Sequence, residues 1–299
     1  MSTDDDGRLM RMATYASVAT ATILIFAKLA AWAVTGSVAL LSTLIDSALD
    51  AAASLINLWA VRHALTPADH DHRFGHGKAE ALAGLGQAAF IAGSGGVLVV
   101  EALSRLYHRE PVTNEGIGIA VMVFSSLLTA LLIRFQRKVV ARTNSLAITA
   151  DATHYTADVM INGSVVVSLL MSLLLGWTFA DPLFAVAIAG YLMWSGWHII
   201  VASFDTLMDR ELPEAERQRI GEIARAHPMV RDMHDLRTRT SGLRGFAQLH
   251  LELDADLPLH RAHQIADEVE AAINAAFPSL EIIIHQDPVG LREQHPSFN

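Results

Sequence analysis

Two apolar stretches decide the fold: VALLSTLIDSALDAAASLINLWAV at residues 38–61 and LAITADATHYTADVMINGSVVVSLLMSLLLGW at residues 146–177. Each is long enough to cross the ~30 Å hydrocarbon core of a bilayer as a helix, for which about 20 residues suffice. The composition agrees, because 52% of the 299 residues are hydrophobic and only 18% are charged, which is more apolar than a soluble domain normally is. The sequence therefore predicts a membrane protein.

Each stretch also carries two ionisable side chains four residues apart, Asp46 with Asp50 and His154 with Asp158. This spacing places both members of a pair on one helix face. A charge at the centre of a membrane helix costs about 2.5–3.5 kcal/mol on insertion scales, and such residues are usually functional. If the two helices face each other, three carboxylates and one imidazole converge as donors for a tetrahedral divalent metal ion. The alternative to a metal site is that each charge is buried separately against polar neighbours. That alternative does not explain why two pairs with the same spacing occur.

The whole chain contains six apolar stretches of about the length of a membrane span, which predicts an all-α bundle of six transmembrane helices. They are residues 13–34, 38–61, 81–107, 116–135, 146–177 and 182–204. Residues 1–12 begin with several aspartates, unlike a cleavable signal, and are expected to form a short amphipathic or frayed lead. Lys28 falls inside the first span and should snorkel or find a partner in the bundle.

Basic residues indicate the orientation, because Lys and Arg collect on the cytoplasmic side of a membrane. One side carries Arg8, Arg11, Arg62, Arg73, Lys78, Arg134, Arg137, Lys138, Arg142 and Arg210, and the other side only Arg105 and Arg109. Both termini are therefore expected to be cytoplasmic.

The sequence after Phe204 changes to charged, ordinarily hydrophobic segments typical of a small soluble α+β domain. A helix is expected after Leu212, with Pro213 in its first turn. Alternating patterns predict strands at 234–240 and 246–254, joined by a glycine-containing turn. A helix at 260–277 and a strand at 281–286 complete the order αββαβ. We expect a membrane domain at 1–207, a metal-binding domain at 208–290 and a tail at 291–299.

Potential metal ligands also gather outside the spans. In the turn DHDHRFGHGK at residues 69–78, Asp69, His72 and His76 could bind one ion, and the glycines would let the turn fold around it. A solvated polar loop is the alternative. In the last strand, His285 and Asp287 are two residues apart, so their side chains point to the same face of the sheet.

The other elements of the C-terminal domain bring further imidazoles toward that strand, from His234, His250 and His263. Shared coordination of one or two metal ions, with Asp287 as a bridge, is the favoured interpretation over five separate surface or core residues. The chain has 14 His and no Cys, which argues against copper(I), iron–sulfur and disulfide chemistry. A net charge of −9 gives no support to nucleic-acid binding.

Four motifs together resemble the cation diffusion facilitator family, in particular its bacterial zinc and ferrous-iron efflux proteins, over nearly the whole chain. They are the D-x-x-x-D of residues 42–50, PADHDHRFGHGKAE at 67–80, the H-x-x-x-D of residues 150–158 and IHQDP at 284–288. The sequence departs from the family pattern at two places. His70 and Asp71 add potential metal ligands to the loop, and Thr153 stands where relatives often have Leu.

The resemblance implies a homodimer in the bacterial inner membrane, with six spans per protomer and a cytoplasmic metallochaperone-like domain. It implies a transport site of Asp46, Asp50, His154 and Asp158, a loop site of Asp69, His72 and His76, and a dimer-stabilising site of His234, His250, His263, His285 and Asp287. It also implies a charge interlock between Lys78 and Asp209.

The donors predict metal-for-proton exchange by alternating access, because a metal ion needs ionised carboxylates and a neutral imidazole, so protons compete with it. An imidazole, with an unperturbed pKa of about 6.5, titrates in the working range. Three oxygen donors and one nitrogen donor suit Zn²⁺, and Cd²⁺ should follow it. Donor type alone distinguishes Fe²⁺ and Mn²⁺ only weakly from zinc. The cytoplasmic sites would then sense metal load.

Two other classes compete with this secondary active transporter. A membrane-embedded zinc hydrolase would need a general base beside its ligands, typically in H-E-x-x-H, and the sequence contains no such motif. A membrane-anchored metal sensor, whose cytoplasmic domain carries the function, would gain nothing from carboxylates inside its anchor.

Overall fold

The computed structural model describes residues 3–107, 116–175, 177 and 180–290. The tail expected at 291–299, and Arg109 of the orientation argument, lie outside these residues. The chain forms two compact units, Met1–Phe204 and Asp205–Asn299.

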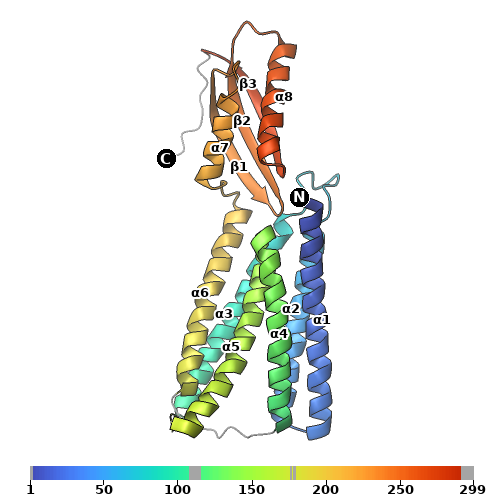
Figure 1. The fold of residues 1–299 in the computed structure, drawn as a ribbon, viewed down its shortest axis with the longest axis vertical. Helices are drawn as coiled ribbons and strands as arrows, with labels where there is room; N and C mark the ends of the chain where they lie inside the picture. The colour runs from blue at the N-terminus through green and yellow to red at the C-terminus, as the bar shows by residue number, and fades with distance from the viewer. Residues whose placement is uncertain (1–2, 108–115, 176, 178–179, 291–299) are drawn as a thin grey trace. The chain divides into compact units, whose positions relative to one another are not determined.

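The N-terminal unit is a bundle of long helices (Figure 1). In chain order they are α1 (Thr3–Thr35), α2 (Val38–Ala64), α3 (Lys78–Tyr107), α4 (Gly116–Thr143), α5 (Leu146–Leu175) and α6 (Ala180–Leu207). Within the described residues, each of these helices except α5 contains a stretch that is long and apolar enough to cross a membrane. α5 has 30 residues and carries several ionisable side chains in its N-terminal half.

α1 differs from the sequence-based expectation. It is continuous from Thr3, so, of the two expectations for residues 1–12, the frayed lead is wrong, whereas a helix with buried and exposed positions is found at residues 4–12. Asp4, Asp5 and Asp6 occupy its first turn, where carboxylates favour the positive end of the helix dipole. Arg142 on α4 also donates a hydrogen bond of 2.7 Å to Asp6.

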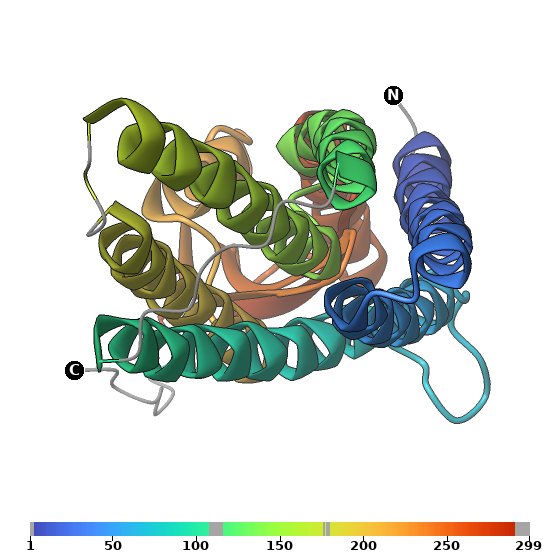
Figure 2. The same ribbon diagram turned by 90° about the horizontal axis from the view of Figure 1, so that it is seen from below.

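Small residues allow close helix packing within this unit. A Cβ on Gly84 of α3 would come 2.7 Å from the Ser203 hydroxyl of α6, and one on Gly196 of α6 would come 3.6 Å from the Ala88 carbonyl of α3. α3, α5 and α6 also share a buried core that includes Ile91 and Leu192. Seen along the bundle, α1 and α2 lie at one side, and α5 and α6 extend toward the other (Figure 2).

The C-terminal unit is a three-stranded sheet with two helices. Its elements are α7 (Glu214–Arg225), β1 (Asp232–Ser241), β2 (Arg244–Leu253), α8 (Leu259–Ala276) and β3 (Leu280–Pro288). β1 and β2 form an antiparallel hairpin, and β2 and β3 run parallel through the α8 crossover. The predicted architecture, a helical membrane region followed by a small αββαβ domain, is confirmed.

One face of this sheet packs against α7 and α8 to form the core, and the other face carries polar residues. Leu249 and Leu251 of β2 are buried with Ile220 of α7 and Ile265 of α8. Side chains alternate along a strand, so His250 lies on the opposite face. The strand register then aligns His234, His250 and His285 across the three strands.

Candidate metal sites

A first group of ligands lies between α2 and α5, within the apolar part of the chain. Asp50, His154 and Asp158 offer ligand atoms within 4.8 Å of one another, and we call them the membrane cluster. His154 Nε2 lies 2.9 Å from Asp50 Oδ1 and 3.9 Å from Asp158 Oδ2. All three side chains are partly buried. Two carboxylates and an imidazole in this arrangement can hold a divalent ion.

A polar stripe on α2 aligns it antiparallel to α5. Ser54 and Tyr155 share a hydrogen bond of 2.9 Å between their hydroxyl groups, and Asn57 donates to the Ala147 carbonyl at 3.4 Å. Asp50, Ser54 and Asn57 recur at helical spacing on one face of α2. This pairing fixes Asp50 opposite His154.

Asp46 belongs to the same face of α2, one turn before Asp50, but its carboxylate lies outside the 4.8 Å group. Its side chain is exposed. The structure therefore brings together three of the four residues predicted for the transport site. Lys28 of α1 reaches this region, where its ammonium donates to the Thr43 carbonyl at 3.0 Å and to Ser47 Oγ at 2.6 Å, so it finds its partners in the bundle.

Asp151 was not among the predicted site residues, although it lies one turn before His154. Its carboxylate is buried and accepts hydrogen bonds from Ser17 of α1 at 2.5 Å, Gln136 of α4 at 2.6 Å and Gln87 of α3 at 3.3 Å. These bonds tie the N-terminal half of α5 to three neighbouring helices. The sequence signal for Asp151 was a carboxylate within an apolar stretch. Its three partners could not be predicted, because each belongs to a different helix.

Glu80 was also missed, and it orients the same end of α5. It is buried, accepts a hydrogen bond from the Ser145 hydroxyl and lies 3.4 Å from the Ala147 amide. α3 thus supplies a carboxylate to the buried backbone N–H groups at the start of α5, which have no partner within the helix.

A second group, the loop cluster, consists of Asp69, His72 and His76, whose ligand atoms also lie within 4.8 Å of one another. His76 Nε2 is 3.3 Å from Asp69 Oδ2, and His72 Nδ1 is 3.4 Å from Asp69 Oδ1. Gly75 adopts φ +80°, which lets the loop turn between the two histidines. The backbone N–H of His72 donates to Asp69 at 2.7 Å and holds the pKa of this carboxyl below its ordinary value, so it is ionised and ready for a metal ion.

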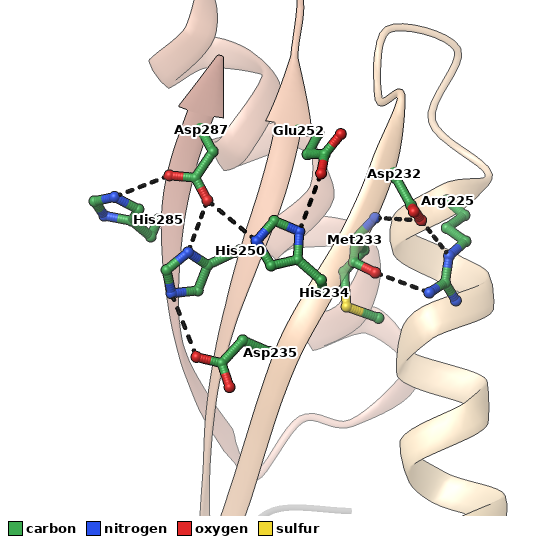
Figure 3. Close-up of polar contacts among 9 residues, drawn as sticks. All are labelled: Arg225, Asp232, Met233, His234, Asp235, His250, Glu252, His285 and Asp287. Atoms are coloured by element: carbon green, nitrogen blue, oxygen red, sulfur yellow. Dashed lines mark hydrogen bonds and ion pairs between the residues drawn. The ribbon is translucent and has the colours of Figure 1, made fainter. Parts of the chain in front are cut away.

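The third group, the sheet cluster, consists of His234, His250 and Asp287 and lies across the sheet (Figure 3). Asp287 Oδ2 is 2.8 Å from His250 Nδ1 and 3.4 Å from His234 Nε2. Its other oxygen lies 3.1 Å from His285 Nε2. The carboxylate thus lies between three imidazoles, an arrangement that allows it to bridge two ions.

A local irregularity supports this cluster. The β1–β2 register shifts between His234 and Arg237, and Asp235 there adopts φ +47°, as in a β-bulge. Asp235 Oδ2 comes within 3.9 Å of His250 Nε2, and Glu252 lies 3.4 Å from His234 Nδ1. Sequence alternation alone did not indicate these two acidic neighbours.

Three of the predicted residues, His263, Lys78 and Asp209, do not belong to these three clusters. His263 on α8 lies outside the sheet cluster, and its exposed ring is 3.7 Å from Asp267. Lys78 and Asp209 belong to different units, so their interlock stays a prediction. Within the C-terminal unit, Asp209 lies 3.4 Å from Arg239.

Comparison with known proteins follows the same division of the chain. Residues 14–208 match the cation efflux transmembrane domain, and residues 212–289 match the cytoplasmic domain of cation efflux proteins. The chain belongs to the cation efflux family. Membership of the cation efflux family makes it a multi-pass membrane protein and a metal transporter, as the resemblance implied.

Curated members of the cation efflux family are similar along nearly their whole length. The cation-efflux pump FieF of Salmonella paratyphi A and that of Salmonella enteritidis PT4 are each 47% identical over 282 residues, which cover 94% of this chain and 94% of the relative. Among solved structures, a zinc form of CzrB is 39% identical and covers 29% of this chain and 99% of its own, with a TM-score of 0.26. A nickel form of the MamM C-terminal domain is 29% identical and covers 27% and 100%, with a TM-score of 0.25.

Proposed function

We propose that this cation efflux protein is a Zn²⁺/H⁺ antiporter that exports zinc from the cytoplasm. The observation that carries the proposal is the membrane cluster, where Asp50 of α2 meets His154 and Asp158 of α5. Ionisable residues inside a membrane bundle mark ion pathways in transporters. Asp46, one turn along α2, is the fourth proposed ligand.

Zinc is favoured by the donor set. Carboxylate oxygens and an imidazole nitrogen suit tetrahedral Zn²⁺, whereas Mg²⁺ and Ca²⁺ prefer more oxygen donors. Cd²⁺ and Fe²⁺ are the next candidates, because donor type discriminates them weakly from zinc. The Salmonella relatives are named cation-efflux pumps, and this name does not specify the metal.

Proton coupling follows from competition for the same atoms. His154 Nε2 faces Asp50 at 2.9 Å, so a proton shared by this pair occupies the place that a metal ion would need. Zinc arriving from the cytoplasm displaces that proton, and protons from a more acidic exterior displace the zinc. Alternating access of the cluster to the two sides converts this competition into exchange.

The loop and sheet clusters are proposed as further zinc sites with structural and regulatory roles. In the proposed homodimer, the sheet cluster would form the dimer-stabilising metal site together with His263 and His285. Lys78 and Asp209 would form the charge interlock. Both termini would face the cytoplasm, in the bacterial inner membrane.

Liposomes with an imposed pH gradient and a trapped zinc indicator test the transport proposal. Zinc flux should require the gradient and collapse in Asp50→Ala and in His154→Ala. His198→Ala is the matched control, because His198 is a histidine of α6 outside all three clusters. Unchanged flux in the two variants would contradict the proposed site. A folded parent that binds zinc but moves none would favour the membrane-anchored sensor.

A further inference from the structure

The loop cluster has an imidazole neighbour that belongs to α2. His63 lies in the last turn of α2, and its ring meets the ring of His76 edge-on with centroids 4.6 Å apart. His72 contacts the same ring at 4.6 Å. His76 is therefore flanked by two other histidines, one from its own loop and one from the preceding helix.

His76 itself is unusual in its environment. Its side chain is only 4% exposed, and its Nδ1 is buried without a hydrogen-bond partner among the residues that the structure describes. Its Nε2 is directed to Asp69 at 3.3 Å. A histidine that binds a metal ion normally has its second ring nitrogen satisfied as well. Among the described residues, the buried Nδ1 of His76 therefore lacks the partner that this second nitrogen would be expected to have.

The number of ligands points in the same direction. The loop cluster offers three donors, whereas a closed zinc site has four. His63 is exposed and stacks on Trp59, at 5.5 Å between ring centroids, so a side-chain rotation can bring one of its nitrogens to the cluster. The remaining imidazole of the loop, on His70, is 92% exposed and lies 3.7 Å from Asp71.

We propose that His63 completes the loop site, so that a divalent ion is held there by the imidazoles of His63, His72 and His76 and the carboxylate of Asp69. This inference rests on the proposed loop site but not on transport. A four-ligand site has no open position, so the ion would clamp the end of α2 to the loop before α3. The site would hold its ion in place and would not pass it on.

The absence of cysteine from the chain permits a direct test. In full-length protein that carries His154→Ala and His250→Ala, which each remove a ligand from another cluster, zinc X-ray absorption should show three imidazoles per bound ion. His63→Phe, which keeps a ring against Trp59, should reduce the count to two and weaken zinc binding at least about tenfold. His63→Cys should introduce a Zn–S distance of about 2.3 Å.

Two comparisons make the outcome decisive. His70→Ala should leave the zinc affinity and the imidazole count unchanged, and His72→Ala should lower both. If His72→Ala lowers them while His63→Cys gives no Zn–S distance, His63 is not a ligand and the inference is overturned, whereas the three-residue loop site stands. If zinc binding does not respond to His72→Ala, the loop site fails as well. Neither result alters the liposome test of the membrane cluster.

Discussion

The hydroxyl groups of Tyr155 and Ser54 lie 2.9 Å apart and join α5 to α2 immediately beside the membrane cluster. Tyr155 follows His154 in the chain, and Ser54 lies one turn after Asp50. Both side chains are almost completely buried. The bond therefore positions the two helices whose ligands must meet.

Tyr155→Phe removes this bond and leaves the Ser54 hydroxyl buried without it. Loss of one partner of a buried hydrogen bond costs about 1–3 kcal/mol, so we expect a lower free energy of unfolding in detergent. Misplacement of the helices should also weaken zinc binding at the membrane cluster by roughly tenfold. Tyr191→Phe, on α6, is the matched control. Full zinc affinity in Tyr155→Phe would show that the bond does not position the ligands.

Lys28 places a positive charge beside the membrane cluster. Its ammonium donates to Ser47, the residue after Asp46, and its charge acts on Asp46, Asp50 and Asp158. Two unit charges interact by roughly 4 kcal/mol at about 4 Å and an effective dielectric constant of about 20, and by less at longer range.

Lys28→Met should therefore raise the affinity of the membrane cluster for Zn²⁺ by at least about tenfold. Zinc release, and hence flux, should become slower. Lys28→Arg keeps the charge and should bind zinc with nearly the parent affinity. Isothermal titration of each variant measures the change, and an equal or weaker affinity in Lys28→Met would refute the repulsion.

Asp151 should matter for stability because it joins α5 to α1, α3 and α4. Asp151→Ala would leave the donors of Ser17, Gln87 and Gln136 without their shared acceptor, so we expect a loss of about 1–3 kcal/mol in the free energy of unfolding. Asp6→Ala removes the exposed pair with Arg142 and should cost less than about 1 kcal/mol. Chemical denaturation of both variants gives the comparison, and similar losses would mean that the buried network adds nothing.

The sheet cluster predicts a zinc-dependent gain in the stability of the C-terminal unit. A ligand that binds only the folded state stabilises it by about 2.7 kcal/mol at a concentration of 100 times Kd. His250→Ala should abolish most of this gain, and His260→Ala, at the exposed start of α8, should retain it. Thermal unfolding with zinc and with a chelator measures both. The same gain in His250→Ala would exclude this cluster as the stabilising site.

His263 gives a separate prediction about the dimer. Because it lies away from the sheet cluster in one chain, His263→Ala should reduce zinc-dependent dimerisation while leaving much of the zinc binding by each protomer. Sedimentation velocity with and without zinc checks this expectation. Loss of both dimerisation and protomer binding would instead place His263 among the ligands of its own chain.

The sequence alone was enough for the architecture, because the length of an apolar run and its periodicity are local properties. The helices α2 and α5 begin at the predicted residues Val38 and Leu146, and the αββαβ order appears as expected. The start of α1 was misjudged because polar residues before Met12 can continue a helix beyond its apolar part. Motif spacing also indicated the membrane and sheet clusters, since ligands four residues apart on a helix or two apart on a strand share a face. The loop cluster was indicated by the gathering of ligands in one short turn.

Only the tertiary structure decided which of these ligands meet and what holds them. It brings Asp50 to His154 but leaves Asp46 outside the 4.8 Å group, because convergence depends on how two helices cross and rotate. It also joins Asp151 to Ser17 over 134 residues and brings His63 against His76. Such contacts depend on the packing of distant segments, and periodicity within one segment carries no information about that packing.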